Sequence, residues 1–282
     1  MSLDIKIYQR KFQPHAGKAI QALLDGFKRH GVKAEWMYQG YYKPSDLAVI
    51  WGVRFPNIIQ GQKEHSGDYL VLERGYFKDR MNYFSLGYNG LNGRAEFHAE
   101  NSPPDRWEKH GVEVKPWKTD GKYILLMGQV SGDQSLQGIN LRIWYQEVID
   151  KVKTLTDMPI FFRPHPLARQ QEIGLDCDRY ERGPLIESLQ DAYLVITFNS
   201  NTGVDAVLNG IPAIAMDRGS MAWDMAQHGI IRDRPDRTEW SYNLERITPD
   251  RTQWLYDLGY KQWLPEEIAS GEAWAHLKRR YA

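Results

Sequence analysis

The polar residues with the clearest chemistry follow a buried apolar run in the second half of the chain. Tyr193–Phe198 predicts a strand and Val204–Asn209 a helix, so the turn between them brings hydroxyl and amide groups to the start of the helix. Ligands bind at the carboxyl ends of parallel strands, and a helix amino terminus favours a phosphate. The turn therefore predicts a phosphate-binding site made of Asn199, Ser200, Asn201, Thr202 and Gly203, although these residues could serve only to cap the helix.

A second strand end carries cationic and hydrogen-bonding groups. Pro159–Phe162 predicts a strand, and Arg163 and His165 follow it directly. His165 could donate a hydrogen bond to a phosphate, and Arg163 could form a forked pair with one. The alternatives are a structural histidine between two prolines and a solvated arginine in an ion pair. Asp205, in the first turns of the next helix, could accept from a ribose hydroxyl or only complement the helix dipole.

Two carboxylates also come at strand ends. Glu73 closes the predicted strand Tyr69–Glu73, and Asp133 lies in the loop after Tyr123–Met127. A group transfer to a hydroxyl requires a carboxylate as general base or as nucleophile, and this pair could supply both. Glu73 could instead form an ion pair with a neighbouring arginine, and Asp133 could be a turn residue beside Gly132.

The elements that must position these residues alternate between strand and helix in both halves. Short continuous apolar runs predict parallel strands that are buried on both faces. In the first half the expected strands are Ile5–Tyr8, Val32–Met37, Asp46–Trp51 and Tyr69–Glu73, with a helix from Pro14 to about Arg29. In the second half a strand at Ile211–Met216 and helices at Leu141–Leu155, Leu185–Ala192 and Met221–His228 join those already named.

The alternation is lost between Phe84 and Trp117. Glycines and asparagines follow Tyr83 closely, and paired prolines come later, which predicts turns and loops. We therefore predict one α/β domain over residues 1–118 and a second over 119–282. The tryptophan-rich tail from Asp250 predicts helices that pack on the body and can return to the first domain.

Composition limits the partners. Lys and Arg number 36 and Asp and Glu number 36, so no overall field attracts nucleic acid or an anionic membrane. The single cysteine, Cys177, excludes an internal disulfide and fits a reducing cytoplasm. No apolar run is long enough to cross a membrane. No DxD or HExxH motif occurs and the histidines lack ligand spacing, so we expect neither a metal site nor a cofactor.

Four segments together resemble a known family. They are Gly128–Ser135 (GQVSGDQS), Phe162–Pro166 (FRPHP), Thr197–Ala215 (TFNSNTGVDAVLNGIPAIA) and Leu70–Arg80 (LVLERGYFKDR). The chain resembles the capsule-polysaccharide Kdo transferases and their shorter relatives, including phage-encoded ones. The resemblance implies a GT-B fold, with two Rossmann-like domains facing a cleft and helices at the C-terminus. It also implies a nucleotide-sugar donor as co-substrate, with residues 1–118 as the acceptor-side domain and 119–282 as the nucleotide-sugar-binding domain.

The resemblance also assigns residues. It implies that Glu73 and Asp133 are catalytic and that Gln129 joins the residues above in binding the nucleotide sugar. This chain has the length of one transferase module where capsule enzymes can carry two. Asp205 stands where relatives often carry glutamate, which leaves its nucleotide contact open.

The acceptor is not specified by these motifs. It could be a growing glycan or lipid-linked sugar, or, as for the phage relatives, a hydroxymethylated pyrimidine in DNA. Lysines between Lys109 and Lys122 would suit DNA, but acidic residues interleave with them. A non-catalytic nucleotide-sugar-binding protein is the alternative from another class. The sequence does not indicate an oligomeric state.

Overall fold

The chain forms two compact units. The computed structural model describes residues 3–9, 14–38, 40–168, 174–232 and 241–281. The first unit comprises Met1–Val112 together with Thr252–Ala282, and the second comprises Glu113–Arg251. The change of unit thus comes six residues before the position 118 expected from the sequence, and the C-terminal helices belong to the first unit.

The first unit is built on a five-stranded sheet with the order β2-β1-β3-β4-β5. Its first four strands are parallel, and β5 runs antiparallel to β4. The strands are β1 (Ile5–Tyr8), β2 (Ala34–Met37), β3 (Leu47–Trp51), β4 (Asp68–Arg74) and β5 (Phe84–Tyr88).

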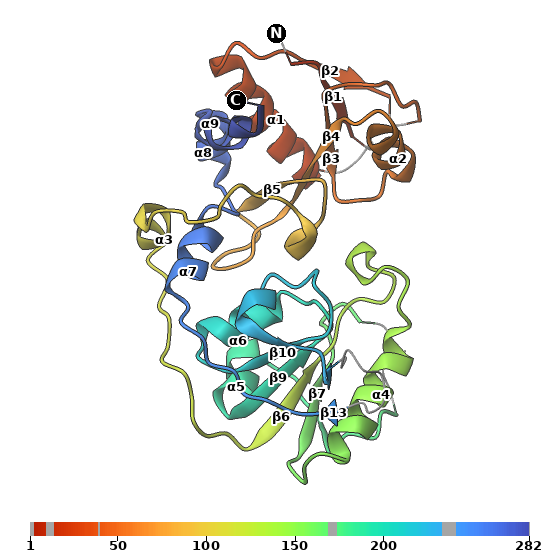
Figure 1. Cartoon of the computed structure of the whole chain (residues 1–282), viewed down its shortest axis with the longest axis vertical. Helices are drawn as coiled ribbons and strands as arrows, with labels where there is room; N and C mark the ends of the chain where they lie inside the picture. Colours follow the sequence, from red (N-terminus) through yellow and green to blue (C-terminus); the bar gives the residue numbers. More distant parts are fainter. Residues whose placement is uncertain (1–2, 10–13, 39, 169–173, 233–240, 282) are drawn as a thin grey trace. The chain divides into compact units, whose positions relative to one another are not determined.

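Helices cover both faces of this sheet (Figure 1). One face packs against α1 (Pro14–Arg29), α8 (Pro265–Ala269) and α9 (Glu272–Leu277), and the shared core includes Phe27 and Trp274. The other face packs against α2 (Pro56–Glu64). Alternate residues of β1, β3 and β4 enter these two cores, which explains why these strands read as largely continuous apolar runs.

The prediction of turns and loops after Phe84 was wrong for its first residues. Strand β5 pairs with β4 along its whole length, and Gly87 brings it close to its covering segment, because a Cβ there would lie 2.6 Å from the Cβ of Ala95. The turn follows, with Asn89 and Asn92 at positive φ. The asparagines thus belong to a tight turn after the strand, and Gly87 belongs to a close packing contact within it. Because neither residue type favours a strand, the sequence did not predict β5.

The second unit contains a six-stranded parallel sheet with the order β11-β10-β9-β6-β7-β8. On one face α4 (Leu141–Lys153) packs against the sheet, and α6 (Thr202–Leu208) contacts β9 and β10 (Figure 1). The strands are β6 (Tyr123–Met127), β7 (Ile160–Arg163), β8 (Arg179–Tyr180), β9 (Ala192–Thr197), β10 (Ala213–Ala215) and β11 (Ala226–His228). The unit also contains α5 (Leu185–Gln190) and a hairpin of β12 (Ile231–Arg232) with β13 (Ser241–Tyr242).

The helix expected over Met221–His228 was wrong. A single 3-10 turn occupies Trp223–Met225, and β11 then extends the sheet beyond β10. The backbone of Ala226–His228 makes its hydrogen bonds with β10 at the edge of the sheet. These bonds replace the ones that a helix would form within the segment.

The C-terminal segment is held to the first unit by a buried charge. Helix α3 (Asp105–His110) packs beside α7 (Thr252–Gly259), and Arg106 of α3 is 4 % exposed. Its guanidinium donates to Glu267 at 3.0 Å and lies 3.7 Å from the ring centre of Trp263. The apolar residues expected to pack the tail are buried, namely Trp254, Leu255, Leu258, Trp263, Ile268, Trp274 and Leu277.

Candidate functional site

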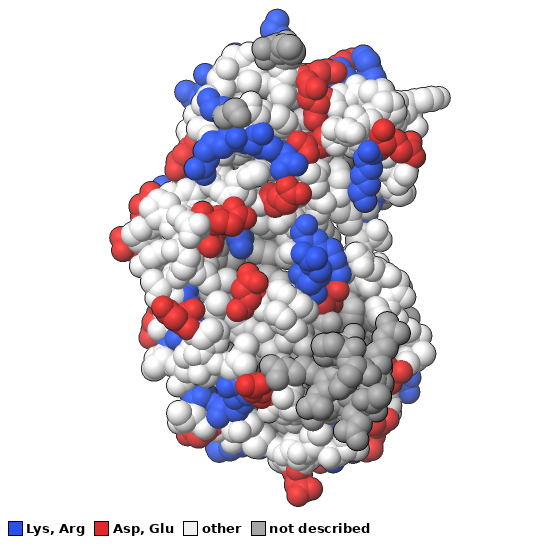
Figure 2. Space-filling model, in the orientation of Figure 1, with Lys and Arg blue, Asp and Glu red and all other residues white. Residues whose placement is uncertain are grey.

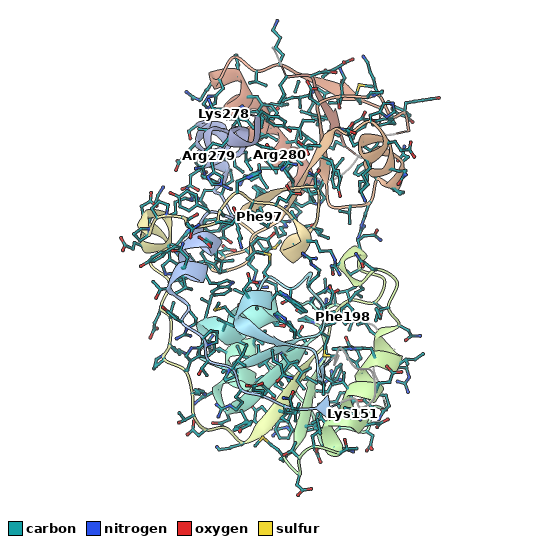
Figure 3. All side chains as sticks on the ribbon, viewed as in Figure 1. Phe97, Lys151, Phe198, Lys278, Arg279 and Arg280 are labelled. Atoms are coloured by element: carbon teal, nitrogen blue, oxygen red, sulfur yellow. The ribbon has the colours of Figure 1, made fainter. Side chains whose placement is uncertain are left out.

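The strand order of the second unit brings four polar strand ends to one edge of the sheet. Strands β10, β9, β6 and β7 are consecutive neighbours and parallel, so the residues after them share the carboxyl edge. Phe198, labelled in Figure 3, follows β9 at this edge. Gln129 follows β6, Asn199 follows β9 and Asp217 follows β10.

Asn199 is the centre of a hydrogen-bond network at this edge. It is 3 % exposed, and its side-chain Oδ1 accepts from Gln129 Nε2 at 2.8 Å. Its backbone N–H donates back to Gln129 Oε1 at 3.0 Å. Its Nδ2 donates to the carbonyl of Ser135 at 2.8 Å and to Asp217 Oδ1 at 2.7 Å. One buried amide therefore fixes the segments that follow β6, β9 and β10 relative to one another.

The turn after Asn199 opens α6, two residues earlier than expected. Ser200 makes a local cap, because its Oγ accepts from the N–H of Thr202 at 3.3 Å and its own N–H donates to Thr197 Oγ1 at 2.9 Å. The Oγ1 of Thr202 is buried and has no hydrogen-bond partner among the described residues. Such a group costs free energy in the folded chain unless a ligand or water completes it.

Close packing shapes the same turn. A Cβ on Gly203 would lie 3.2 Å from the Cβ of Ala222, so the helix start and the segment after β10 lie against each other. Asn201 and Asp205 are both half-buried, and Asp205 lies one turn into the helix, where its carbonyl accepts from the side chain of Asn209. The predicted residues from Asn199 to Asp205 thus form one continuous turn and helix start.

His165 lies beside this network on the neighbouring strand end. A Cβ on Gly128 would lie 2.9 Å from the backbone N of His165, so the segments after β6 and β7 touch. The Nδ1 of His165 accepts from the N–H of Leu167 at 3.1 Å, which makes the neutral ring carry its proton on Nε2. The half-buried ring therefore has a hydrogen-bond donor on the nitrogen away from the backbone.

Arg163 has a different environment from the one expected. It is 8 % exposed, and its guanidinium donates to Ser188 Oγ at 2.9 Å and to the carbonyl of Gly183 at 2.5 Å. These bonds tie the end of β7 to α5 and to the segment before it. In this structure Arg163 therefore serves the packing of the unit, and its fork is occupied by protein groups.

The two candidate carboxylates belong to different units. Asp133 is exposed, and its Oδ1 accepts from the N–H of Ser135 at 2.8 Å, which caps the 3-10 turn Gln134–Leu136. Glu73 is half-buried near the end of β4, and its Oε1 accepts from the N–H of Arg74 at 3.0 Å. Glu73 Oε2 would lie 3.5 Å from a Cβ on Gly52, which places it beside the end of β3. Each carboxylate has a local structural contact, and their joint role in catalysis stays a prediction.

Three residues of this edge did not appear among the predicted site residues. Asp217 binds Asn199 and accepts from the N–H of Gly219 at 3.0 Å. Arg218, at the tip of that turn, is exposed, and its guanidinium has no hydrogen bond or ion pair with another described residue. Both follow a buried strand directly, so the rule applied to Asn199 could have found them. Tyr145 accepts from the N–H of Gln129 at 2.7 Å from within α4, and nothing local in the sequence marks it.

Within the described ranges, no three His, Cys, Asp or Glu side chains are grouped so that they could hold a metal ion. No helix in the described part of the chain combines the length and the apolar character needed to cross a membrane.

Comparison with solved structures identifies the fold. The chain is similar to two β-Kdo transferase structures of KpsC from Thermosulfurimonas dismutans. The 2,7 transferase has a TM-score of 0.58 at 15 % identity, with 96 % of this chain and 99 % of that chain covered. The 2,4 transferase has a TM-score of 0.58 at 13 % identity, with 93 % and 92 % covered. No family model and no curated protein matches the sequence. The GT-B-like α/β fold implied by the four motifs is confirmed.

Proposed function

We propose that this chain is a glycosyltransferase that moves a sugar from a nucleotide-sugar donor to an acceptor hydroxyl. One observation carries the proposal: the polar ends of β6, β9 and β10 are tied through Asn199 into a single network beside the start of α6. Nucleotides bind at the carboxyl edges of parallel sheets. A binding site also needs a few well-placed polar groups, and this edge provides them.

We assign the donor phosphate to hydrogen-bond donors of this edge. Thr202 offers a buried hydroxyl without a protein partner, and His165 offers Nε2–H. Arg218 offers a guanidinium that no described residue engages. Together they would stabilise the negative charge that develops as the sugar–phosphate bond breaks. Arg163 acts behind them by holding the end of β7 in place.

The bond changes balance without a further reagent. The anomeric carbon loses the phosphate oxygen and gains the acceptor oxygen, and the acceptor proton passes to a carboxylate. Glu73 and Asp133 are the proposed carboxylates, one as base and the other as base or nucleophile. Glu73 belongs to the first unit and Asp133 to the second.

The names of the similar structures suggest which donor to test first. Both are described as β-Kdo transferases, so nucleotide-activated Kdo is the first candidate donor, with a saccharide hydroxyl as acceptor. The test incubates the full chain with a panel of nucleotide sugars that includes activated Kdo, with oligosaccharide acceptors, and detects products by mass spectrometry. A product whose mass equals acceptor plus one sugar supports the proposal.

A binding function without transfer predicts a different result. Glu73 and Asp133 each make a local backbone contact, as a non-catalytic protein could also require. Such a protein would bind one donor of the panel by calorimetry and return it unchanged with every acceptor. Absence of binding to all donors would contradict both functions.

A further inference from the structure

The first unit contains an open pocket at the end of its sheet opposite to Glu73. Its volume is about 1440 Å³, and it is lined by the amino ends of β1, β3 and β4, by the start of β2 and by the last helix of the chain. Asp68 lies at this end of β4, and Glu73 lies near the other. At about 3.3 Å per residue the two are roughly 16 Å apart along the strand. The pocket is therefore separate from the carboxyl ends that carry the proposed transfer.

The acidic groups of the pocket are engaged by protein partners. Lys6 is 6 % exposed and forms ion pairs with Asp4 at 2.8 Å and with Glu35 at 2.5 Å. Asp46 accepts from the N–H of Asp4 at 2.7 Å, and Asp68 binds the guanidinium of Arg280 at 2.6 Å. These hydrogen bonds leave carboxylate lone pairs that can accept further from ligand hydroxyls.

The basic groups of the rim are not neutralised in the same way. Lys33 is exposed and forms no ion pair with a described residue. Lys278 contacts only the ring of His30 among the described residues, at 3.3 Å, and Arg279 binds only His276. Figure 2 shows lysine and arginine side chains gathered over the C-terminal helices, and Figure 3 labels Lys278, Arg279 and Arg280 there. The rim thus has cations available for an anion.

One residue of the pocket wall also carries a buried donor without a partner among the described residues. Trp274 lines the pocket and is 2 % exposed, and its indole Nε1 has no hydrogen-bond partner among the described residues. Buried indole N–H groups normally find an acceptor, so this one lacks a group that a ligand or an ordered water can supply.

We propose that this pocket binds an anionic saccharide chain at a site distinct from the transfer site. Sugar hydroxyls both donate and accept, so they match walls that mix carboxylates with cations, and a carboxylate or other anion on the sugar matches Lys33, Lys278 and Arg279. A DNA backbone only accepts hydrogen bonds, so it cannot donate to the carboxylates of the pocket as a sugar hydroxyl can. The proposal rests on the proposed function only in taking a saccharide as the acceptor class, and the pocket would retain the acceptor between transfers.

The test measures binding of three probes to the full chain by calorimetry. They are hexagalacturonate as a carboxylated saccharide, maltohexaose as a neutral saccharide of equal length, and hexathymidylate as a phosphate polyanion. We expect hexagalacturonate to bind most tightly. The double variant Lys33→Ala/Lys278→Ala should lose about tenfold in affinity per cation, the effect of losing a charge-assisted hydrogen bond. The matched control Lys18→Ala/Lys63→Ala removes two exposed lysines of the same unit from outside the pocket.

A second variant tests the buried donor. Trp274→Phe keeps an aromatic ring in the core and removes the N–H, so hexagalacturonate affinity should fall by about threefold while the fold is retained. Equal binding of hexagalacturonate to wild type and both pocket variants would overturn the proposal, as would preferential binding of hexathymidylate that the double variant abolishes. Binding of nucleotide sugars to the wild type, measured in parallel, separates the two proposals. If no nucleotide sugar binds, the proposed function is contradicted, and the measured affinity for hexagalacturonate still tests the pocket.

Discussion

Gln129 and Asn199, which are 70 positions apart, exchange two hydrogen bonds at the carboxyl edge of the second sheet. The side chain of each residue thereby accepts from the other, and Asn199 keeps its Nδ2 group for Ser135 and Asp217. The arrangement requires an amide at position 199, because only an amide side chain offers an accepting oxygen together with two donor hydrogens.

Replacement of Asn199 by aspartate should destabilise the chain. The new carboxylate would face Asp217, where Nδ2 now donates at 2.7 Å, and burial prevents water from screening the repulsion. We expect the free energy of unfolding to fall by about 2–3 kcal/mol in urea titrations at pH 7. The matched variant Asn199→Asp/Asp217→Asn restores one donor and one acceptor and should recover most of this loss. A fully stable single variant would contradict the network.

Replacement of Thr202 by valine should separate folding from ligand binding. Valine has the shape of threonine, and the lost Oγ1 has no protein partner, so the variant should be at least as stable as the wild type. If the hydroxyl meets the donor phosphate, calorimetry should show a fall in donor affinity of about tenfold. Unchanged affinity for a donor that binds wild type would show that Thr202 makes no such contact.

The two arginines at this edge should respond in opposite ways. Arg218→Ala removes an exposed guanidinium, so stability should hold while donor affinity falls by about tenfold. Arg163→Ala leaves the buried Ser188 Oγ and the carbonyl of Gly183 without their donor, which should cost about 1–3 kcal/mol of stability. Urea titration and calorimetry on both variants test this. If Arg163→Ala lowered donor affinity at unchanged stability and Arg218→Ala did not, Arg163 would be the residue that contacts the phosphate.

The carboxylate variants can be chosen so that local structure is retained. Asp133→Asn keeps an oxygen that caps the 3-10 turn, and Glu73→Gln keeps an acceptor for the N–H of Arg74. Donor affinity should therefore hold while turnover falls by about 100-fold or more, as for a lost general base. Unchanged turnover of either variant would show that the replaced carboxylate is not catalytic.

Buried histidines of the first unit should make the chain sensitive to acid. Burial and the nearby charge of Arg106 lower the pKa of His110 to about 4, and burial with the charge of Arg279 lowers the pKa of His276 to about 4. The unfolded chain binds these protons near pH 6.5, so it gains protons first as pH falls. The stability contribution is complete above about pH 6.5 and is lost as pH falls towards 4.

Glu267 should extend this loss to lower pH. Burial alone would raise its pKa, but hydrogen bonds from Arg106, Lys109 and the N–H of Leu264 lower it to about 2. Its contribution is present above about pH 4.5 and is lost as pH falls through 2. Thermal unfolding between pH 7 and pH 4 tests the histidines, and His110→Phe should flatten that part of the profile. An unchanged profile in this variant would contradict the assignment to His110.

Local pattern was sufficient for the parallel strands and for the placement of polar strand ends. A strand covered on both faces has a continuous apolar run, and the carboxyl ends of neighbouring parallel strands share an edge. This reasoning brought His165 and Asn199–Gly203 together, the family resemblance added Gln129, and the strand order places all of them on one edge. It applied equally to Asp217, which the prediction left out.

Tertiary structure alone decided what pairs with what. Arg163 was expected at a phosphate because its position after a strand is visible in the sequence, whereas its partners Ser188 and Gly183 are not. Strand β5 was hidden because Gly87 reflects contact with Ala95 and carries no local strand preference. The ion pair of Arg106 with Glu267 joins residues 161 positions apart. The apolar pattern of a strand or helix can be read from neighbouring residues in the sequence. The partners of Arg163, Gly87 and Arg106 cannot, because folding alone brings those chain segments together.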